Sequence, residues 1–472
     1  MITVMKFGGT SVGSAEALKR AANIIIGEEG NKVVVVSAMS GITNFLVSAV
    51  NDKNMPLKDV MNTFREKHIK VAKELLSDEL MKEFVSDFDL RFNAFTDLLA
   101  KKVWCPDPNG PTINYNTANG KNNKVDPYYE DNLTSQGERF SSLLLSYVLR
   151  SMGRKSVALT SEMAGVYAVG KPLSGGCDLR RTATGMNINV KLLLNDDVIP
   201  VLTGFYGINE DGKPLTFGRG GSDYAAAAIG NALDADAIQI WTDVNGFMSA
   251  DPRLVPNAVT LTEMNYNEAA ELAHFGAKVL HSRTIEPARL KHIPLWVKNS
   301  YEPKNHGTLI HQIREQRDEP LRGVAMKLDL SIITINSGEI SYKPMMIAKI
   351  LEKLAEAEIV IYAISTSLSN IAFLVHNLDV KTCLSYFNRL RNVDIERITV
   401  RDNQTLICAV GDGLLDRRGF CGDIFAAVKD VGASVEMISE GASDVALNFV
   451  VSTDSAAEVV KMIHKNFIKG GN

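Results

Sequence analysis

Cysteine is scarce in this sequence, and its placement argues against two common uses of the residue. The 472-residue chain has five cysteines, an odd number, with no CxxC pair among them. Disulfide-rich secreted domains need paired cysteines, and structural zinc sites need closely spaced ligands. We therefore expect a protein of a reducing cytoplasm, without disulfides or zinc. The cysteines are Cys105, Cys177, Cys383, Cys408 and Cys421.

A strong net charge and long apolar runs are also missing. The formal net charge is −4, which does not indicate the basic surface typical of nucleic-acid binding. No apolar stretch approaches the roughly 20 residues that a membrane-spanning helix needs. The first six residues read as a strand rather than as a secretion signal. We expect a cytoplasmic protein with neither nucleic-acid nor membrane partners.

Several catalytic signatures are absent as well. The sequence has no GxxxxGK[ST] phosphate loop, no protein-kinase HRD or DFG set, no GxSxG nucleophile motif and no GxGxxG dinucleotide fingerprint. Its eight histidines form no evident catalytic pair. No group of residues has the spacing of metal ligands, so we expect no metal bound by the protein alone.

What the sequence does contain is an alternation of strands and helices. Residues 2–7 form a short apolar segment, and residues 33–36 are four consecutive valines, as in strands buried on both faces of a parallel sheet. Helical patterns separate the further strand candidates, which are residues 156–159, 198–202, 237–241 and 295–297. The alternation predicts an α/β domain with a mainly parallel sheet and helices on both faces.

Turns rich in glycine and hydroxyl groups follow the predicted strands. Residues 8–11 and 37–44 each end a strand and open a helix, and ligands of open α/β sheets bind at the carboxyl ends of the strands. Residues 216–224 (TFGRGGSDY) place three glycines around Arg219, and Ser222 is a suitable N-cap for the next helix. On its own, this turn fits a tight strand-to-helix connection and an anion site equally well.

Residues 106–132 interrupt the alternation. The segment is rich in asparagine, proline and glycine, which predicts a long surface loop. It is either a lid or an idle insertion, and we favour the idle insertion. A helix of apolar and small residues is predicted over residues 140–149, with Glu138 near its start. A carboxylate there either complements the helix dipole or holds the cation of a ligand.

The C-terminal part contains an internal repeat. It follows residues 301–320, a polar segment with two prolines that we interpret as a linker. An offset of 74 residues pairs Ile350 with Ile424, Leu354 with Val428, Ile364 with Ile438, and Ala372 with Ala446. Residues 332–375 and 406–450 are thus predicted to be two copies of a ferredoxin-like α+β module. Such a pair suits a regulatory ligand site or a surface that only supports dimerisation.

Charged side chains accompany the glycine turns in the first 300 residues. They are Lys6, Glu138, Arg219, Asp223, Asp243 and Lys278. Cations beside glycine turns suit phosphoryl transfer, in which catalysis depends mainly on positioning and charge stabilisation. The pattern indicates a phosphate-handling α/β enzyme and leaves its acceptor open.

Seven motifs, in order, resemble those of the aspartokinases, a family within the amino acid kinase superfamily. They are residues 6–12 (KFGGTSV), 36–44 (VSAMSGITN), 137–138 (GE), 218–224 (GRGGSDY), 241–244 (WTDV), 251–253 (DPR) and 275–281 (FGAKVLH). The resemblance covers essentially the whole chain and includes two C-terminal ACT modules. Acetylglutamate and glutamate 5-kinases share the fold, but they are less like this chain in the opening motif and the paired ACT modules.

The resemblance implies both an activity and a domain plan. The activity is ATP-dependent phosphorylation of the side-chain carboxylate of L-aspartate to 4-phospho-L-aspartate, the first step of lysine, threonine and methionine biosynthesis. The plan is a catalytic domain of the amino acid kinase fold over residues 1–300, a linker over 301–320, and ACT modules over 321–395 and 396–472.

The same resemblance assigns residues on the phosphate-donor side. Lys6 would contact the transferring phosphoryl group, and Gly8 and Gly9 would offer it backbone N–H groups. Lys278 would be the second cation, and Asp223 would orient both lysines. The nucleotide site would further be lined by Thr242, Asp243 and Arg253. Mg²⁺ would arrive with ATP and be held mainly by its phosphates.

On the acceptor side, the resemblance assigns four residues. Arg219 would hold the α-carboxylate of aspartate and Glu138 its α-ammonium, while Thr43 and Ser222 would donate or accept hydrogen bonds nearby. The acceptor is already a carboxylate nucleophile, so no general base is needed. This explains why no histidine stands out.

The sequence also departs from the family pattern. Met248 stands where many members have a tyrosine against the nucleotide, although a thioether can fill the same space. In the first ACT module, residues 336–345 keep Gly338 but lack the expected glycine-rich turn, and Tyr362 and Leu368 replace acidic residues of lysine-sensitive relatives. We predict weak or altered feedback control, with threonine a better candidate effector than lysine. The ACT modules further predict a homodimer or homotetramer.

Two alternatives stay open at this point. One is an amino acid kinase with another carboxylate acceptor, and the other is a non-catalytic subunit that senses amino acids. A non-catalytic chain would have little reason to keep all five of Lys6, Glu138, Arg219, Asp223 and Lys278.

Overall fold

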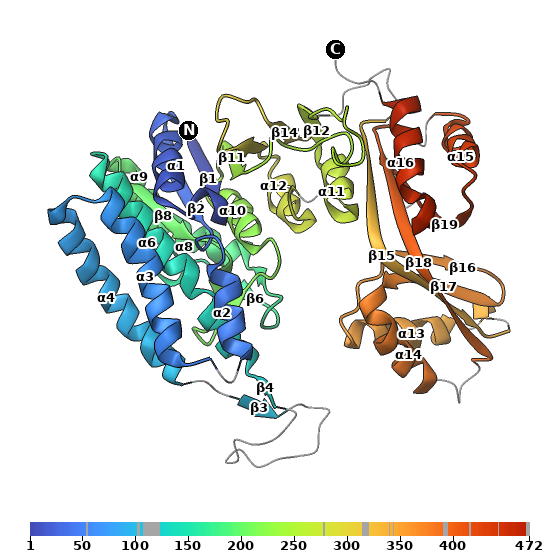
Figure 1. The fold of residues 1–472 in the computed structure, drawn as a ribbon, viewed down its shortest axis with the longest axis horizontal. Coiled ribbons are helices and arrows are strands. Elements are labelled where there is room, and N and C mark those ends of the chain that lie inside the picture. Colours follow the sequence, from blue (N-terminus) through green and yellow to red (C-terminus); the bar gives the residue numbers. More distant parts are fainter. Residues whose placement is uncertain are drawn as a thin grey trace. The chain divides into compact units, whose positions relative to one another are not determined.

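The chain folds into two compact units, which are described separately (Figure 1). The computed structural model describes residues 1–52, 55–101, 104–106, 123–276, 279–313, 321–338, 340–342, 344–389, 395–414, 417–441 and 443–468. Unit 1 comprises Met1–Phe247, Thr262–Tyr266 and Val279–Gln312; unit 2 comprises Met248–Leu261, Asn267–Lys278 and Ile313–Asn472. Among the described residues, no helix is long and apolar enough to span a membrane.

Unit 1 is built on an eight-stranded sheet in the described part of the chain. Its strand order is β12-β14-β13-β11-β1-β2-β8-β5, and neighbouring strands are parallel except for β13 and β14. The strands are β1 (Ile2–Phe7), β2 (Asn31–Val36), β5 (Ser156–Leu159), β8 (Ile199–Thr203), β11 (Ala237–Thr242), β12 (Glu263–Asn265), β13 (Leu295–Asn299) and β14 (Thr308–His311). The predicted, mainly parallel sheet is confirmed, and the four valines of β2 are fully buried.

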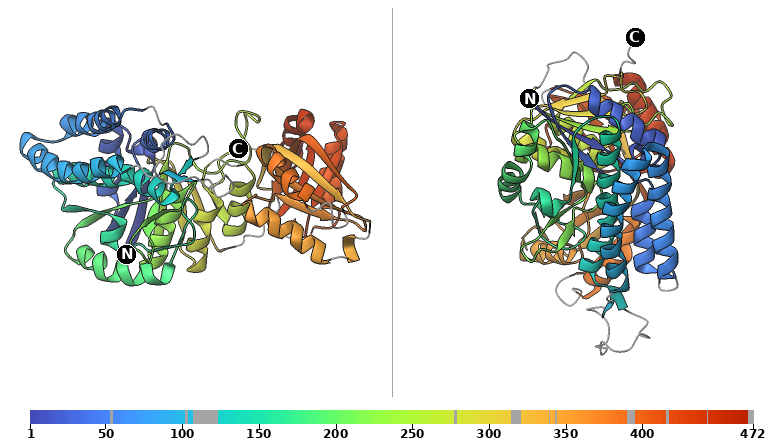
Figure 2. Two further views of the ribbon diagram at one scale, coloured as in Figure 1. Left: turned by 90° about the horizontal axis from the view of Figure 1, so that it is seen from below. Right: turned by 90° about the vertical axis from the view of Figure 1, so that its left-hand side faces the viewer.

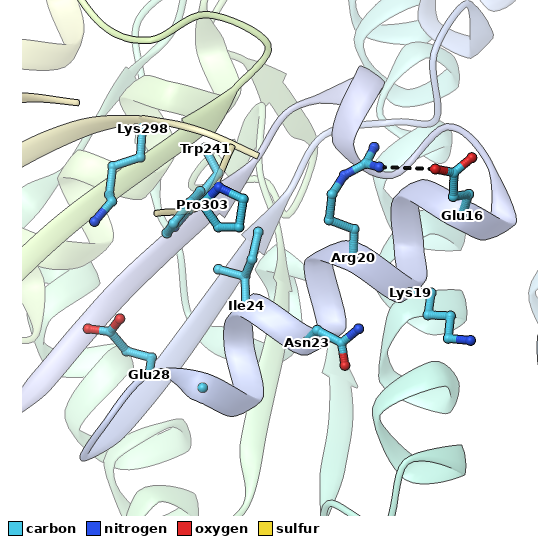
Figure 3. A pocket seen from close by; sticks show the side chains of 10 residues that line it. Glu16, Lys19, Arg20, Asn23, Ile24, Glu28, Trp241, Lys298 and Pro303 are labelled. Atoms are coloured by element: carbon cyan, nitrogen blue, oxygen red, sulfur yellow. Dashed lines mark hydrogen bonds and ion pairs between the residues drawn. The ribbon is translucent and has the colours of Figure 1, made fainter. Parts of the chain in front are cut away.

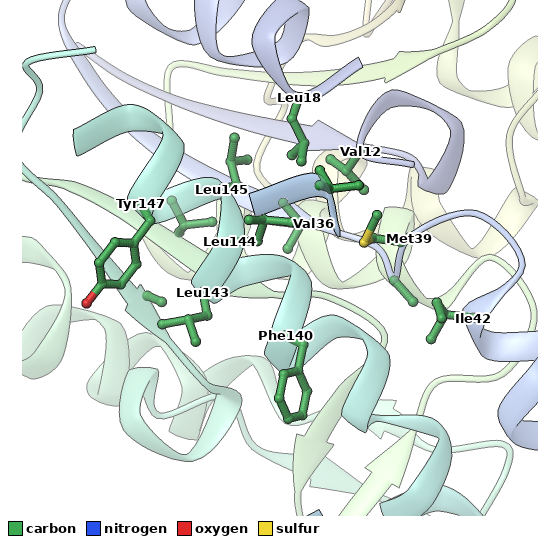
Figure 4. Close-up of a cluster of buried hydrophobic side chains, with 14 of the residues drawn as sticks. Val12, Leu18, Val36, Met39, Ile42, Phe140, Leu143, Leu144, Leu145 and Tyr147 are labelled. Carbon is green, nitrogen blue, oxygen red and sulfur yellow. The ribbon is translucent and has the colours of Figure 1, made fainter. Parts of the chain in front are cut away.

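One face of this sheet packs against α1, α3, α4 and α6. Phe7, Val36 and Trp241, from three neighbouring strands, join one apolar cluster with these helices. Figure 4 shows Leu143, Leu144 and Leu145 of α6 within that cluster. The helices are α1 (Ala15–Gly27), α3 (Leu57–Leu75), α4 (Asp78–Ala100) and α6 (Gln136–Ser151). Figure 2 shows the long helices α3 and α4 side by side, and their Phe64 and Phe95 rings lie 4.6 Å apart.

The opposite face carries α10 (Gly221–Ala232). Ile238 and Trp241 of β11 are an odd number of residues apart, so they point to opposite faces of the sheet. A Cβ on Gly230 of α10 would lie 2.6 Å from the Ile238 side chain, so only glycine permits this close approach. Further helices of unit 1 are α2 (Ile42–Asn51), α5 (Pro127–Thr134), α7 (Ser161–Ala164), α8 (Leu179–Asn189), α9 (Lys191–Asn195) and α12 (Ile285–Leu290).

The structure corrects two predicted loops. Within the predicted surface loop 106–132, residues 127–134 form α5, and β3 (Trp104–Pro106) pairs with β4 (Asn123–Val125); residues 107–122 lie outside the described residues. Within the predicted linker 301–320, β14 belongs to the unit 1 sheet. The cause at β14 is its pairing with the neighbouring strand β13 and with β12, which is distant in sequence.

Unit 2 contains a six-stranded sheet in its described residues, with the order β16-β17-β15-β18-β20-β19. All its strand pairs are antiparallel. The strands are β15 (Gly323–Asn336), β16 (Ala363–Thr366), β17 (Asn370–His376), β18 (Arg397–Val410), β19 (Val435–Ser439) and β20 (Ala446–Ser452). The helices are α11 (Tyr266–Phe275, mostly in this unit), α13 (Pro344–Glu356), α14 (Val380–Arg389), α15 (Phe420–Asp430) and α16 (Thr453–Phe467).

The internal repeat has a structural counterpart. Ile350 on α13 and Ile424 on α15 are both fully buried, each in its own apolar cluster. Each copy has a helix followed by two antiparallel strands and a second helix. The two ferredoxin-like modules of the predicted fold class are therefore present.

The two module cores do not follow contiguous chain segments. Val324 near the start of β15 packs in the α15–α16 cluster, whereas Ile333 near its end packs in the α13–α14 cluster. The register of β15 against β18 shifts between Lys327 and Ile332. Both long strands thus serve both modules, so the cores differ from the expected division at residues 395 and 396.

Candidate active site

The carboxyl ends of β1, β2 and β8 bring several predicted site residues together. β1 lies between β2 and β11, so the chain order reverses there, which is where open α/β sheets form their ligand crevice. The Gly204 N–H, just after β8, donates to the Val36 carbonyl at 3.0 Å. A Cβ on Gly204 would lie 2.8 Å from the Cβ of Ser222. The start of α10 is therefore held directly against these strand ends.

Lys6 is held by an ion pair with Asp223. Its Nζ lies 2.5 Å from Oδ1 of Asp223, in the first turn of α10. The two side chains are only 8% and 16% exposed, so the pair is largely shielded from water. The contact is an ion pair, and Oδ1 of Asp223 has no hydrogen-bond partner among the described residues. The pair brings a positioned cation to the end of β1.

Glu138 is a buried carboxylate in the first turn of α6. It is 2% exposed, and its Oε1 accepts the Ala38 N–H at 3.0 Å. Its Oε2 is buried and has no hydrogen-bond partner among the described residues. Burial raises the pKa of Glu138 to about 8, although the Ala38 N–H and the charge of Lys6 oppose that rise. A buried oxygen in this state can accept a hydrogen bond from a ligand cation.

Glycine at position 137 is what allows Glu138 to reach Ala38. A Cβ on Gly137 would lie 2.5 Å from the Ala38 Cβ and 3.1 Å from Cγ2 of Ile42. Contacts under 3.0 Å force a neighbour to move. In the Gly-Glu motif, Gly137 therefore lets α6 pack closely against the turn after β2, and Glu138 places its carboxylate at that contact.

The two glycines after β1 differ in whether their backbone N–H is already used. The Gly8 N–H donates to the Trp241 carbonyl at 3.2 Å and is therefore already used. A Cβ on Gly8 would lie 3.4 Å from Nζ of Lys6, so glycine keeps the space beside the ammonium open. In the described part of the chain, the Gly9 N–H makes no hydrogen bond and stays available to a ligand.

The turn over residues 216–224 presents Arg219 between two left-handed glycines. Gly218 has φ +73° and Gly220 has φ +70°, which favour glycine. α10 begins at Gly221 with Gly220 as its N-cap, so Ser222 is not the N-cap that the sequence predicted. Arg219 is exposed, and its side chain has no hydrogen bond or ion pair to any described residue. Its guanidinium is free to bind a carboxylate.

Thr242 ends β11, two strands from β2, and Asp243 follows it. The Thr242 hydroxyl donates to Oδ1 of the exposed Asp243 at 3.2 Å, and the Thr242 carbonyl accepts the Ser300 N–H at 2.8 Å. Thr43 lies half-buried in the first turn of α2, which opens after β2. These residues border the same strand ends, in unit 1, as Lys6.

Two residues that the resemblance assigns to the nucleotide side cluster with unit 2, and one further residue lies outside the described part of the chain. Arg253 and Met248 are part of unit 2, where the Arg253 guanidinium pairs with Asp251 at 2.5 Å. Lys278 lies outside the described residues. Helix α11 ends at Phe275, before Gly276 with φ +152°. Within the described ranges, no group of three or more His, Cys, Asp or Glu could hold a metal ion.

The sequence motifs did not point to three residues that lie near this site. Ser300 hydrogen-bonds Ser11 of the opening motif at 2.9 Å. Asp131 and Arg283 bind the backbone around the Arg219 turn. Asp131 stands in the segment that we took for an idle insertion, and Arg283 follows the FGAKVLH motif by two residues.

A cavity of about 580 Å³ lies away from this constellation (Figure 3). Arg20, Ile24 and Glu28 of α1 line it together with Trp241 and Lys298. None of its lining residues is a predicted site residue. Trp241 lines the cavity, and its carbonyl accepts the Gly8 N–H.

Comparison with known proteins identifies the family. A profile of the amino acid kinase family matches residues 1–299, and a profile of the ACT domain matches residues 407–467. The first match covers more than half of the 472 residues. The chain belongs to the amino acid kinase family.

Its relatives within that family are aspartokinases. Lysine-sensitive aspartokinase 3 of Escherichia coli is 28% identical, over 99% of each chain. Aspartokinase 1, chloroplastic, of Arabidopsis thaliana is 29% identical, over 99% of this chain and 80% of that protein. A bifunctional aspartokinase/homoserine dehydrogenase of Buchnera aphidicola is also 29% identical, and this chain spans 56% of its length.

Among solved structures, similar folds also come from aspartokinases. The crystal structure of E. coli aspartokinase III with aspartate and ADP, in the R-state, has a TM-score of 0.82 at 28% identity, covering 99% of this chain and 100% of that chain. The T-state of the same enzyme, with lysine and aspartate, has a TM-score of 0.76 at 27% identity.

Proposed function

We propose that this protein transfers the γ-phosphoryl group of ATP to the side-chain carboxylate of L-aspartate, giving 4-phospho-L-aspartate and ADP. The observation that carries the proposal is the Glu138 carboxylate, buried with one unpartnered oxygen beside the Lys6–Asp223 ion pair. It is a ready receptor for an ammonium group next to a cation suited to phosphate. The similar E. coli enzyme binds aspartate and ADP.

On the acceptor side, the amino acid is held at both ends of its backbone. Arg219 grips the α-carboxylate, for which a planar guanidinium provides two parallel donors. Glu138 accepts the α-ammonium through Oε2, while Thr43 and Ser222 bind nearby. This arrangement leaves the side-chain carboxylate directed at the donor.

On the donor side, Lys6 and the Gly9 N–H contact the transferring phosphoryl group, and Asp223 orients Lys6. Lys278 supplies the second cation, and Thr242, Asp243 and Arg253 line the nucleotide. Mg²⁺ enters with ATP, held mainly by the phosphates, and neutralises part of their charge.

The reaction needs no base. One carboxylate oxygen of aspartate bonds to the γ-phosphorus while the bond to the bridging oxygen breaks, and ADP leaves with the electron pair. No proton moves, so the chain's task is positioning and charge stabilisation.

The experiment is an aspartyl-hydroxamate assay of the purified protein with ATP and Mg²⁺. Turnover of aspartate supports the proposal. Turnover of a different acid instead points to another amino acid kinase activity, and no turnover of any acid points to a sensing subunit.

Arg219→Ala tests the division of labour between the two sides. We expect it to raise the KM for aspartate roughly 10- to 100-fold, because a charged hydrogen bond to the substrate is lost, and to leave the KM for ATP unchanged. Arg289→Ala is the matched control, since Arg289 and its partner Glu286 are both exposed side chains of α12. Equal effects on both KM values would contradict the role of Arg219.

The ACT modules provide regulation and self-association in this proposal, through a homodimer or homotetramer. Near Tyr362, the Lys327 ammonium lies 5.3 Å from the ring centroid, so a cation already occupies this region. Leu368 is 60% exposed and offers no counter-charge. We propose threonine rather than lysine as the effector. Potent inhibition by lysine in a titration of activity would exclude this.

A further inference from the structure

A hairpin that the motifs do not include packs on the Arg219 turn. Strands β6 (Ala168–Val169) and β7 (Gly176–Cys177) pair antiparallel. Next to β7, the Gly175 N–H donates to the Thr216 carbonyl at 2.9 Å. A Cβ on Gly218 would lie 3.0 Å from the Leu173 carbonyl oxygen. The tip of the β6–β7 hairpin therefore touches the backbone directly before Arg219.

Asp131 of α5 fixes this contact from one side. The residue is fully buried, and its Oδ2 accepts the Leu173 N–H at 3.0 Å. Its Oδ1 accepts the hydroxyl of Thr216. Leu173 has φ +65°, a conformation that a leucine adopts only where its surroundings impose it. One carboxylate thus joins the hairpin tip and the first residue of the Arg219 turn.

Arg283 fixes the same contact from the other side. Its Nη1 donates to the Phe217 carbonyl at 3.0 Å, and its Nη2 donates to the Gly175 carbonyl at 2.8 Å. Its guanidinium carbon lies 4.9 Å from the Tyr224 ring centroid, at the far end of the turn. The Tyr224 hydroxyl in turn accepts the N–H of Cys177 in the hairpin. A guanidinium fork can span two carbonyls in this way, and an ammonium cannot hold the same geometry.

We propose that Asp131 and Arg283 are positioning residues for the amino-acid substrate, which clamp the β6–β7 hairpin onto the Arg219 turn and thereby aim Arg219. Arg219 has no side-chain partner among the described residues, so its direction depends on the backbone of Phe217, Gly218 and Gly220. Without the clamp, that backbone is held mainly by the start of α10. The inference rests on the proposed function in that it takes Arg219 as the ligand of the substrate α-carboxylate.

The test compares Arg283→Lys and Asp131→Asn with two surface controls, Arg289→Lys and Asp234→Asn. Asp234 is exposed and pairs with Lys291, so its loss leaves the site unchanged. Hydrogen exchange of peptides spanning residues 170–177 and 216–220 is measured in the full-length protein without substrate. The KM values for ATP and for the acceptor that the wild type uses are measured in parallel.

We expect faster exchange of both peptides in the two clamp variants, because protected amides of the hairpin tip lose their fixed partners. We also expect the acceptor KM to rise about tenfold in Arg283→Lys, as loss of a charged hydrogen bond predicts, with the ATP KM within about twofold of wild type. Asp131→Asn should act in the same direction, because an amide group accepts hydrogen bonds at only one of its two ends.

Unchanged exchange, or faster exchange with an unaltered acceptor KM, would overturn the clamp. So would equal rises in both KM values, since they indicate general loosening. If the wild type phosphorylates another acid but not aspartate, the proposed function fails, whereas the exchange data and the KM for that acid still decide the clamp.

Discussion

At the scale of single residues, Glu138 has the most unfavourable environment among the site side chains of unit 1. An ionised carboxylate is costly to bury, and a buried oxygen without a partner adds the cost of its lost hydration. Only Oε1 is compensated, by the Ala38 N–H. An ammonium from a ligand would supply both a hydrogen bond and a counter-charge. Binding of an amino acid through its ammonium would therefore restore the ionised form that burial disfavours.

This environment leads to a pH prediction. The pKa of Glu138 is raised to about 8, so in the empty protein the carboxyl is mostly protonated below pH 8. An incoming ammonium must then displace that proton. We expect kcat/KM for aspartate to rise with pH about tenfold per unit up to pH 8 and to level off above it, since kcat/KM follows the free enzyme. A pH series at saturating ATP measures this.

Glu138→Gln is the control for that series. Glutamine cannot ionise, so kcat/KM for aspartate should be low and lose the rise below pH 8. The KM for ATP should show no matching dependence in either protein. A wild-type profile that is flat from pH 6 to pH 9 would contradict the assignment of Glu138 to the ammonium.

Site residues could be predicted from the sequence where a local motif contains them. Lys6, Glu138 and Asp223 stand in or beside glycine motifs, and the structure places all three at the same strand ends. Asp131 and Arg283 carry no such signal. Their partners are backbone groups 42 and 66 residues away, Leu173 and Phe217, and only the folded chain brings them into contact.

At the scale of elements, the start of α10 shows where a local rule fails. The N-cap preference for hydroxyl side chains pointed to Ser222. The N-cap is instead Gly220, two residues earlier in the chain. A Cβ added at Gly220 would lie 2.4 Å from the Cβ of His281, so this position needs glycine. In α5 the local signals were present: Asp126 accepts the Tyr128 N–H at 3.0 Å and Pro127 opens the helix. The sequence nevertheless predicted a loop there, because asparagine and glycine dominate the segment around these signals.

The contact between α6 and the turn after β2 gives an element-scale prediction. In Gly137→Ala, the new methyl group would lie 2.5 Å from the Ala38 Cβ, so helix and turn must separate. We expect a loss of about 1–3 kcal/mol in the free energy of unfolding, as for other overpacked sites. The same shift should move Glu138 away from the Ala38 N–H and raise the KM for aspartate. Denaturant unfolding and steady-state kinetics measure the two effects.

Gly422→Ala in α15 is the matched control. A Cβ there would meet no atom within 4 Å, and alanine favours a helix over glycine by up to about 1 kcal/mol. This variant should be as stable as wild type or slightly more so, with unchanged kinetics. A Gly137→Ala protein with wild-type stability and KM would show that the helix start is not tightly packed in solution.

At the scale of the whole molecule, the repeat predicted two modules but not how they share strands. The offset of 74 residues aligns helices and short strands, which are contiguous in each copy. β15 and β18 instead change module midway, where the register shifts. Positive φ values at Asp329 (+63°) and Asn403 (+59°) mark these points, and neither residue type is unusual enough in a sequence to reveal the change.

Unit 2 also holds a segment that the family resemblance assigns to the nucleotide. Phe247 is anchored in unit 1, since its N–H donates to Oγ1 of Thr308 at 2.8 Å. The following residues, Met248–Leu261, cluster with unit 2. There Ala250 and Val255 join the apolar core of α15 and α16. The segment that bears Arg253 is thus packed on the second ACT module.

A buried hydrogen bond fastens this segment to the C-terminal helix. The Ser249 hydroxyl lies 2.9 Å from Nε2 of His464 on α16 and accepts the Val259 N–H at 3.0 Å. Burial lowers the pKa of His464, which keeps the ring neutral at physiological pH and suited to pairing with a hydroxyl. A movement of α16 would therefore move Ser249, and with it the segment that carries Arg253.

Ser249→Ala tests whether the second ACT module sets nucleotide affinity. The change leaves the buried His464 ring nitrogen and the half-buried Val259 N–H without their partner, and the loss at the buried nitrogen alone costs about 1–3 kcal/mol, so the segment should loosen on α16. We expect the KM for ATP to rise several-fold while the KM for aspartate stays near wild type, the reverse of the Arg219→Ala pattern. Ser385→Ala, on an exposed surface of α14, is the control. Equal changes in both KM values would mean that Ser249 only supports the fold. A change in the KM for ATP alone would identify α16 as the element that couples an effector bound to the ACT modules to nucleotide binding.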